Sequence, residues 1–336
     1  MPPSDLVSIL NGVPGALDPA LLLLVALALD ALIGDPPWLW RVLPHPVALI
    51  GAPIGWLERK LNRAGRSAIN RTIRGALATA AIVGAAAAVG WGLHGLLADL
   101  SYGMAGEALI VAVLLAGRSL YGHVRAVARA LETQGLEGGR DAVRHIVGRD
   151  PDGLDRHGVA RAAVESLAEN FADGLVAPAF WYLLLGLPGL FAYKAINTAD
   201  SMIGHRSARY KAYGLVAARL DDAANYLPAR LSGLLIGLAA AFAPGARAGR
   251  ALNIMVKHSG AHASPNAGWP EAAMAGALDL ALGGPRRYPG GVSEVAWIGV
   301  GRARLVGRDI RAALRLYLIA WLLCWLAAAG VALTVL

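Results

Sequence analysis

Residues 194–206 carry side chains that can bind a phosphate group and a divalent cation together. On a helix, five of these side chains project within one sector, and Asp200 lies at the edge of that sector. The five are Lys194, Asn197, Thr198, Ser201 and His205. An ordinary surface helix can carry such a face by chance, but it more often uses Glu and Lys than Asn, Thr and Ser. The composition therefore favours a functional face over a solvated one.

Two adjacent carboxylates, Asp221 and Asp222, are followed one helical turn later by the amide of Asn225. Oxygen ligands at this spacing suit Mg²⁺, which proteins usually hold with one or two carboxylates plus the phosphates of a substrate. A helix N-cap formed by Asp221 or Asp222 explains the same residues. Capping does not exclude metal binding, so both interpretations stay open.

A third polar segment, residues 161–173, spaces its charged side chains by four positions. A helix would align them along one side, which two polar neighbours widen. The residues are Arg161, Glu165, Glu169 and Asp173, with Ser166 and Asn170 beside them. One interpretation is a solvated amphipathic helix at the membrane surface, with Arg161 and Glu165 as an ordinary ion pair. The apolar segment directly after Asp173 favours a helix that lines a cavity, because polar groups beside membrane segments are usually functional.

A loop rich in Pro and Gly precedes a predicted helix near residue 270. Its polar and aromatic members are Ser264, Asn266, Trp269 and Glu271, which follow His258 and Ser259. Such a loop can present backbone N–H groups at a helix N-terminus, which is a ready anion site. A plain connecting loop has the same composition, so this segment is ambiguous on its own.

A smaller polar cluster surrounds the end of the first apolar segment. Asp35 and His45 stand beside prolines, and Asp30 lies within the apolar segment itself. A carboxylate inside an apolar helix is costly unless it is paired, which makes Asp30 a functional candidate. The isolated His94 and His123, by contrast, are expected to be structural.

The elements that must position these residues are membrane helices. Hydrophobic residues make up 56% of the 336 residues and charged residues 16%, whereas soluble domains average about 25% charged. The mean hydropathy is +0.50, and a soluble chain could not bury this much apolar surface. The net charge of +8 comes from arginines scattered between apolar segments. Because they do not line one face, we expect no nucleic-acid partner.

Apolar runs near the roughly 20 residues that a bilayer requires predict the membrane spans. The expected spans are residues 21–33, 75–98, 104–120 and 314–336, and two ambiguous stretches cover residues 175–193 and 231–244. A Gly-Leu-Pro-Gly break at residues 186–189 favours a re-entrant hairpin over a straight helix in the first ambiguous stretch. Small residues recur every fourth position within 75–98 and predict close approach of another helix: Ala76, Ala80, Gly84, Ala88 and Gly92.

The basic loops predict the orientation of the chain. Residues 58–74 contain six Lys or Arg, which places them in the cytoplasm. The polar segments then share the cytoplasmic face of an inner (cytoplasmic) membrane. We therefore expect an all-α, polytopic integral membrane bundle over residues 1–336 as a single membrane-embedded domain. Re-entrant or amphipathic helices should lie at its cytoplasmic face.

At the polar segments the sequence resembles the CobD/CbiB family of adenosylcobinamide-phosphate synthases. The resemblance rests on long motifs that occur in family order over most of the chain, with looser apolar spans between them. The motifs are Gly34-Asp35-Pro36 with Pro44-His45-Pro46-Val47, and residues 159–174, 194–205, 219–230 and 264–271. Several long motifs in order are much more specific than any single cluster.

The resemblance implies an activity in cobalamin (vitamin B12) synthesis. Members of the family join a corrinoid, adenosylcobyric acid, to aminopropanol phosphate or aminopropanol through an amide bond on a corrin propionate, and they consume ATP. A carboxylate and an amine do not condense spontaneously at neutral pH. We therefore hypothesise an acyl-phosphate intermediate that the amine attacks, giving adenosylcobinamide phosphate or adenosylcobinamide.

On this basis we assign roles to the motif residues as hypotheses. The expected ligands of Mg²⁺ on the ATP phosphates are Asp200, Asp221 and Asp222. The groups expected to neutralise phosphate charge are Lys194, His205 and Arg230. Glu165 or Glu169 is expected to take the proton from the incoming ammonium. The remaining candidates for substrate or nucleotide contacts are Asp35, His45, Asn170, Asp173, Asn197, Ser201, Asn225, Ser264, Asn266, Trp269 and Glu271.

Two other classes of protein remain as alternatives. A magnesium-dependent intramembrane prenyltransferase is compatible with Asp221 and Asp222, but it usually shows two similar Asp-rich clusters and gives residues 161–173 no role. A non-enzymatic scaffold or transporter is the second alternative, although a transporter would concentrate its polar residues within its spans. The expected partners are the two substrates and the lipid bilayer, with room for other cobalamin-pathway enzymes at the membrane.

Overall fold

A computed structural model describes residues 18–36, 39–148, 150–288, 291–293 and 296–335. The described chain is almost entirely helical; its strands form two short antiparallel ladders. They are β1 (Leu282–Gly283) with β4 (Trp297–Ile298), and β2 (Arg286–Tyr288) with β3 (Gly291–Ser293). Four of its helical segments are long and apolar enough to cross a membrane: Ala68–Ala98, Gly103–Thr133, Arg156–Ile203 and Gly307–Thr334. The predicted all-α, polytopic membrane fold is therefore confirmed.

The helices group into two compact units, each built from separated parts of the sequence. Unit 1 comprises Met1–Ala116, Ala177–Ala224 and Ala328–Leu336, and unit 2 comprises Gly117–Val176 and Asn225–Ala327. The single domain expected over residues 1–336 stays a prediction, because two compact units can still fold as one domain.

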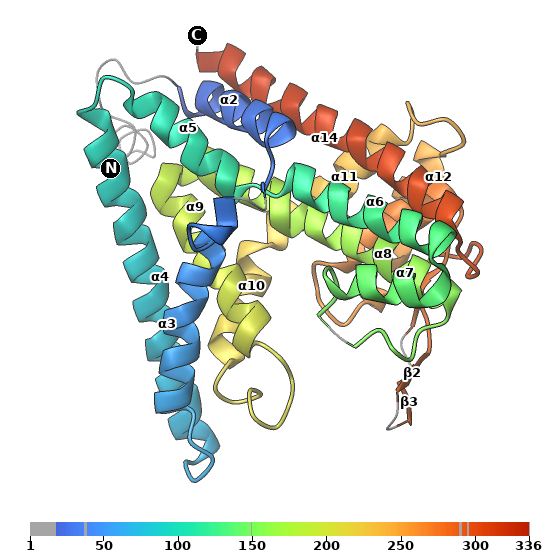
Figure 1. Ribbon diagram of the computed structural model, residues 1–336, viewed down its shortest axis with the longest axis horizontal. Helices are drawn as coiled ribbons and strands as arrows, with labels where there is room; N and C mark the ends of the chain where they lie inside the picture. The colour runs from blue at the N-terminus through green and yellow to red at the C-terminus, as the bar shows by residue number, and fades with distance from the viewer. Residues whose placement is uncertain (1–17, 37–38, 149, 289–290, 294–295, 336) are drawn as a thin grey trace. The chain divides into compact units, whose positions relative to one another are not determined.

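Unit 1 is organised around the long helix α4. Its helices are α2 (Pro19–Leu32), η1 (Leu39–Arg41), α3 (Pro46–Leu61), α4 (Ala68–Ala98), α5 (Gly103–Leu114), α9 (Ala177–Ile203) and α10 (Leu215–Ala224). Figure 1 shows α3 and α4 running side by side, in blue and teal. A core of apolar residues from α3, α4, α9 and α10 holds them together, among them Ile54, Ile82, Ala195 and Tyr213.

The helix α9 is a hairpin and not a straight rod. Gly186 has φ 63° and ψ −155°, a left-handed conformation that glycine adopts without steric cost. A Cβ placed on Gly189 would lie 2.6 Å from the carbonyl oxygen of Trp181, whereas residues eight apart in a straight helix are about 12 Å apart. The predicted break in residues 175–193 is therefore confirmed, and its re-entrant position in a bilayer stays a prediction.

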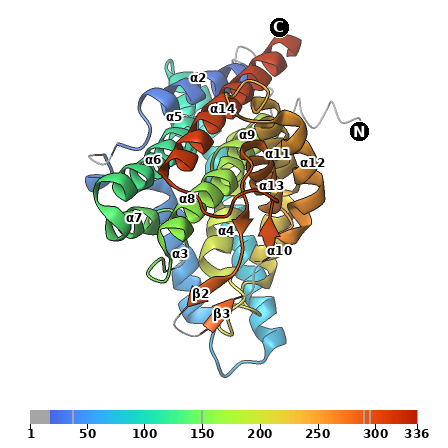
Figure 2. The same ribbon diagram turned by 90° about the vertical axis from the view of Figure 1, so that its right-hand side faces the viewer.

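Unit 2 collects the remaining helices. They are α6 (Gly117–Thr133), α7 (Gly135–Arg144), α8 (Arg156–Phe171), η2 (Ala172–Val176), α11 (Tyr226–Ala239), α12 (Ala248–His258), η3 (Ser259–Ala261), α13 (Gly268–Leu278) and most of α14 (Gly307–Val335). Figure 2 shows α11, α12 and α13 gathered together, and these three helices pack extensively on one another. The Tyr317 hydroxyl of α14 donates to the Gly117 carbonyl at 2.8 Å, which ties α14 to the start of α6.

The helix α8 is buried on nearly all sides, and Val159, Ala163 and Leu167 have no exposed surface. The interpretation of this segment as a solvated surface helix is therefore wrong. The predicted stripe also ends early, because α8 stops at Phe171 and Asp173 lies in the single π-helical turn η2. Glu165 and Glu169 remain on one side of α8, and Asp173 leaves their line.

The predicted spans differ from the helices in three places. Residues 104–120 do not form one helix, because Leu115 is extended, with ψ 153°, between α5 and α6. The helix found within 21–33, α2, has 14 residues, so it rises only about 21 Å, less than the membrane core requires. The stripe of small residues from Ala76 to Gly92 does not face another helix of unit 1. Its members from Ala80 onward are exposed, and Gly75 and Gly90 make the close approaches instead.

Candidate active site

A cavity of about 430 Å³ lies between α3 and the second arm of α9, within unit 1. The polar lining comes from one face of α9, and α3 supplies small and apolar residues. The lining residues are Val47, Ala48, Gly51, Lys194, Asn197, Thr198, Ser201 and Met202. The predicted polar face of residues 194–206 therefore lines a cavity, which is what a binding site needs.

Lys194 gives this cavity its charge. Its side chain is 8% exposed, and it is the one ionisable side chain among the described residues that line the cavity. The hydroxyls of Thr198 and Ser201 donate to the carbonyls of Lys194 and Asn197, at 2.6 and 2.9 Å. Both hydroxyls thus meet the backbone of their own helix, as Ser and Thr commonly do in helices, and Lys194 is left as the main attraction for an anion.

The carboxylates expected to bind Mg²⁺ lie on α9 and α10. The amide of Asn197 donates to an Asp221 carboxylate oxygen at 3.4 Å, which joins the cavity-lining face of α9 to α10. Asp222 forms an ion pair with the exposed Arg219 at 3.4 Å. Both aspartates lie inside α10 and not at its start, so the N-cap interpretation is wrong.

A preformed metal centre is not found in the described part of the chain, where no three His, Cys, Asp or Glu side chains converge. Mg²⁺ is usually bound through one or two carboxylates plus substrate phosphates. The oxygen donors of Asp200, Asp221 and Asp222 are chemically suited to that mode. Their role as magnesium ligands stays a prediction.

His205 does not share the helical face predicted for it, because α9 ends at Ile203. It lies in the segment between α9 and α10, where its ring is 6.2 Å from that of Tyr210. Arg209 in the same segment donates to both carboxylate oxygens of Glu58 at 2.9 Å. Burial raises the pKa of Glu58, but the hydrogen bonds from Arg209 and Asn62 outweigh it and hold that pKa below its usual value. The segment carrying His205 is thereby tied to α3.

Asp35 and His45 lie beside the start of α3. His45 is the N-cap of α3, and its Nδ1 accepts the Val47 N–H at 3.2 Å. Its Nε2 faces an Asp35 carboxylate oxygen at 3.7 Å, and its ring packs edge-on against Trp40, with centroids 4.6 Å apart. These predicted binding residues therefore fix the first turn of the helix that carries Val47, a lining residue of the cavity.

A second cavity, of about 290 Å³, lies within unit 2 and has the opposite charge. It is bordered by α8, the segment before α8, and residues next to η3 and in α13. The lining residues are Ile146, Val147, Gly148, Ala162, Glu165, Ser166, Glu169, His262 and Glu271. Three of the predicted site residues, Glu165, Glu169 and Glu271, therefore border one cavity.

The carboxylates of this second cavity differ in their surroundings. Glu165 is buried, and one of its oxygens accepts the Gly283 N–H at 2.6 Å. Glu271 is also buried and faces His262 Nε2 at 3.8 Å. The N–H of Ser264 donates to His262 Nδ1 at 2.9 Å, so a neutral His262 carries its proton on Nε2, toward Glu271. Glu169 is half-buried on the cavity wall.

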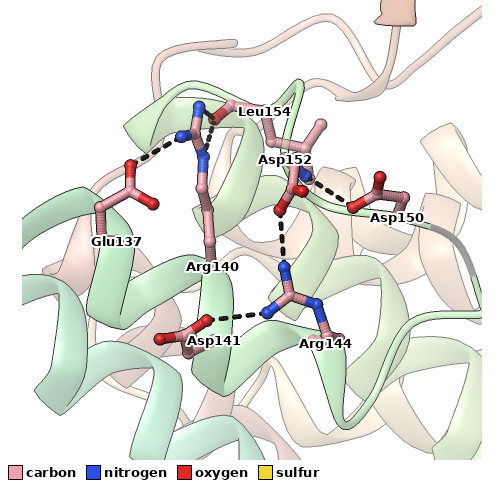
Figure 3. A network of polar contacts seen from close by, with 7 residues as sticks. All are labelled: Glu137, Arg140, Asp141, Arg144, Asp150, Asp152 and Leu154. Atoms are coloured by element: carbon pink, nitrogen blue, oxygen red, sulfur yellow. Dashed lines mark hydrogen bonds and ion pairs between the residues drawn. The ribbon is translucent and has the colours of Figure 1, made fainter.

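The segment between α7 and α8 forms one wall of the second cavity, and a network of ion pairs holds it (Figure 3). Arg140 of α7 donates twice to the Leu154 carbonyl, at 2.9 and 2.7 Å. Arg144 bridges Asp141 and Asp152, at 2.7 and 2.6 Å. From the cavity side, the Ser166 hydroxyl donates to the Ile146 carbonyl at 2.7 Å. The wall is thus fixed from both α7 and α8.

Arg230 of α11 is held between two aromatic rings. Its guanidinium carbon lies 3.5 Å from the centroid of Tyr226 and 4.6 Å from that of Trp269. It also donates to the Asn266 side-chain oxygen at 3.3 Å. Arg230, Asn266 and Trp269, predicted from two separate motifs, are therefore brought together.

The predicted anion site at the start of α13 is partly occupied by the chain itself. The Ser264 hydroxyl oxygen accepts the N–H groups of Asn266 and Ala267 at 3.2 and 3.3 Å. Two of the backbone donors expected to bind an anion are therefore already used. Asn225 and Asn170, two further predicted contacts, lie outside both cavity linings: Asn225 is 1% exposed at the N-cap of α11, and Asn170 donates to the Ser166 carbonyl at 2.9 Å.

Sequence reasoning missed the apolar wall of the first cavity and the histidine of the second. Val47, Gly51 and Met202 have no polar atoms that attract notice, although Val47 directly follows a motif proline. His262 lies between two segments singled out for their polarity, residues 258–259 and 264–271. A polar histidine inside a Pro/Gly-rich loop was the available signal for it.

Comparison with known proteins identifies the family. The CobD/Cbib protein family matches residues 23–317. The chain belongs to this family. It is 53% identical over 302 residues to the cobalamin biosynthesis protein CobD of Brucella suis, covering 88% of this chain and 92% of the relative. It is 47% identical over 279 residues to the protein of the same description from Rhodobacter capsulatus, covering 83% and 86%. No solved structure matches.

Membership of the CobD/Cbib family gives the chain a role in cobalamin biosynthesis, and the apolar helices make it a membrane protein. The predicted family resemblance is thereby confirmed. In this family member, polar residues of the motifs at 159–174 and 264–271 border the cavity of unit 2. Those of the motif at 194–205 line the cavity of unit 1.

Proposed function

We propose that this CobD/Cbib family member is an ATP-dependent ligase that forms an amide bond. Its substrates would be a corrin propionate, that of adenosylcobyric acid, and aminopropanol phosphate or aminopropanol. The observation that carries the proposal is a pair of cavities of opposite charge, one with a buried lysine and one with three carboxylates. Joining a carboxylate to a protonated amine at the expense of ATP requires both kinds of group. One stabilises phosphate charge and the other removes protons.

The reaction proceeds in two steps. A propionate oxygen of the corrinoid attacks the terminal phosphorus of ATP, the bond to the bridging oxygen breaks, and ADP leaves. The amine nitrogen then attacks the acyl carbon, and inorganic phosphate leaves with the former propionate oxygen. The ammonium of the free amine substrate must lose its proton before attack, and the new amide nitrogen must lose a second one.

Carboxylates of unit 2 are suited to accept these protons. Glu169 is the stronger candidate for general base, because Glu165 already uses one oxygen to bind the Gly283 N–H. Glu169 is half-buried on the cavity wall, where an ammonium can reach it. Glu165 and Glu271 would supply the negative field that draws the ammonium in. A positioned base of this kind contributes about 10²- to 10⁴-fold to a rate.

Cationic side chains are suited to stabilise the phosphate groups. Lys194 lines its cavity from a buried position, where a charge acts more strongly than in water. Arg230 and His205 are further candidates for phosphate contacts. Bound Mg²⁺ would neutralise charge on the ATP phosphates, with Asp200, Asp221 and Asp222 as its proposed protein ligands.

Substrate-dependent ATP consumption by purified protein in detergent tests this proposal. We expect ADP release to require both adenosylcobyric acid and the amine, and to be lost in folded Asp200→Ala and Asp221→Ala variants. ATP consumption at the wild-type rate in both variants would contradict the roles of the aspartates. No substrate-dependent consumption by folded wild-type protein would contradict the ligase. Turnover of a prenyl diphosphate instead would favour the prenyltransferase alternative.

A further inference from the structure

We propose that the cavity between α3 and α9 binds the phosphate ester end of the phosphorylated amino alcohol, and that Gly51 sets the size limit of this site. The inference rests on the proposed function, which supplies the substrate. It adds a specific ligand to the cavity and a residue that decides which ligand fits. Gly51 is outside every motif that the sequence pattern singled out.

The charge of the cavity matches one phosphate group. A phosphate monoester carries about −1.5 to −2 charges at neutral pH, whereas the triphosphate of ATP carries about twice as many. The described lining has one ammonium, that of Lys194, and no carboxylate to repel an anion. It also has no aromatic side chain on which an adenine ring would stack. A single phosphate ester therefore suits this lining better than a nucleotide does.

The shape of the cavity favours a small aliphatic ligand. Its volume is about 430 Å³, at the lower end of the range of ligand pockets, and a complete corrinoid is too large for it. Val47, Ala48, Gly51 and Met202 form a small, apolar wall opposite the polar face of α9. A three-carbon chain with one methyl group can pack on this wall while its phosphate meets Lys194.

Gly51 keeps the wall and the polar face apart. A Cβ at this position would lie 3.2 Å from the Met202 sulfur and 4.0 Å from Thr198 Cγ2. The added methyl group would therefore fill space between α3 and α9 and push Met202 within the cavity. Overfilling a packed site costs free energy because neighbours must move, and here the neighbours are themselves lining residues.

Gly55, one turn further along α3, provides a matched control. A Cβ there would lie 3.6 Å from the terminal methyl of the same Met202, an ordinary contact, and Gly55 does not line the cavity. Replacing either glycine by alanine raises the helix propensity of α3 by a similar amount. A difference between the two variants therefore reports on the cavity.

Steady-state kinetics of Gly51→Ala and Gly55→Ala test the proposal. We expect Gly51→Ala to raise KM for aminopropanol phosphate by about tenfold, on the scale of overpacking costs, with KM for ATP and kcat changed by less than about twofold. Gly55→Ala should match the wild type. If Gly51→Ala raises KM for ATP instead, the phosphate in the cavity belongs to the nucleotide and the proposal is overturned. Unchanged KM values for every substrate overturn it as well.

A second pair of variants guards against misfolding of Gly51→Ala. Ala48 is exposed and lines the cavity, whereas Ala52 is exposed on the same helix outside it. Ala48→Leu should raise KM for aminopropanol phosphate, and Ala52→Leu should not. Equal effects of the two substitutions would overturn the assignment.

Ligand-induced thermal stabilisation separates this inference from the proposed function, because it needs no turnover. Aminopropanol phosphate should raise the melting temperature of the wild type and of Gly55→Ala, but not that of Gly51→Ala, in the absence of ATP and corrinoid. This pattern with no amide product would retain the site and reject the ligase. Equal stabilisation of all three proteins, or stabilisation by ADP alone, would overturn the site even if the amide product forms.

Discussion

The two cavities differ in how the chain builds them. The cavity of unit 1 takes its polar residues from two turns of α9, and a single turn of α3 faces them. The cavity of unit 2 draws on α8, the segment before it, and residues more than 90 positions further along the chain, His262 and Glu271. The first cavity is therefore a local product of one helix, and the second exists only when distant segments have packed.

The cavities also differ in charge. Lys194 is the ionisable residue on the described lining of the first, whereas Glu165, Glu169, Glu271 and His262 border the second. Burial makes both arrangements costly unless they are used or compensated. The contrast indicates a division of labour in which phosphate charge is met in unit 1 and protons are removed in unit 2. Each prediction that follows can break or sharpen this contrast.

The largest effect is expected from Glu169→Gln. The substitution keeps the size and hydrogen-bonding ability of the side chain but removes its capacity to take a proton. We predict that kcat for amide formation falls by about 10²- to 10⁴-fold, measured as corrinoid product per unit time. Glu137→Gln is the matched control, because the Glu137 side chain is 79% exposed on α7. Equal activity of the two variants would remove proton transfer from the second cavity.

Replacing the lysine of the first cavity is expected to have the next largest effect. Lys194→Met keeps the aliphatic stem and removes the charge, so kcat/KM should fall by about 10²-fold, the cost of one lost electrostatic contact in a catalytic site. Lys211→Met, at an exposed position between α9 and α10, should retain full activity. A wild-type value of kcat/KM for Lys194→Met would show that phosphate charge is stabilised elsewhere.

The third prediction concerns the pH dependence of the stability of unit 1, whose α3 forms the wall of the first cavity. The folded pKa of Glu58 lies below its usual value, so the contribution of Glu58 is complete above its unfolded pKa of about 4.3 and is lost as the pH falls through the folded pKa. Glu58→Gln should lower the free energy of unfolding at pH 7 by about 1–3 kcal/mol. It should also flatten its decline below pH 5, measured by denaturant unfolding in detergent.

An unchanged pH profile in Glu58→Gln would contradict the importance of the Arg209 ion pair. Glu137→Gln again serves as the control, because exposed ion pairs contribute little to stability.

The smallest effect is expected where neither cavity is involved. The Tyr182 hydroxyl donates to Glu107 at 2.9 Å, and His94 contacts the other oxygen of Glu107 at 3.0 Å. Interhelical hydrogen bonds of this kind in membranes contribute about 0.6 kcal/mol on average. Tyr182→Phe should therefore lower the free energy of unfolding by about that amount and leave amide formation unchanged. A large loss of activity with little loss of stability would place this cluster in the reaction.

The helices could be predicted from sequence because hydropathy acts locally, but their ends could not. The helix around residues 75–98 begins earlier, at Ala68, because its first turns are polar and carry Arg71 and Arg74. Arg71 donates to the Asn62 side chain and to the Arg209 carbonyl, a partner far away in sequence. Hydropathy has no term for such contacts.

The face by which α4 packs was also beyond the sequence. The regular stripe of small residues suggested one face, but Gly75 and Gly90 meet the backbone of Tyr213 and Leu187 on another. Small residues permit close approach, and the partner decides where it occurs. By contrast, the break at Gly186 was predictable, because glycine and proline act on the backbone itself.

The candidate site shows the same division. The polar face of Lys194, Asn197 and Ser201 follows from helical spacing, and these residues line one cavity. The burial of Glu165 depends on the Gly283 N–H, 118 residues away. His262 reaches its cavity in the same way, through the packing of α12, η3 and α13. Spacing predicts a face, and only the fold decides what the face meets.

The most direct test of the account is the mass of the corrinoid product. Purified protein would be incubated with adenosylcobyric acid, aminopropanol phosphate and Mg²⁺, with and without ATP. The account predicts a corrinoid heavier by the amine minus one water, formed only when ATP is present. An unchanged corrinoid mass from folded wild-type protein, in the presence of ATP and both substrates, would contradict it.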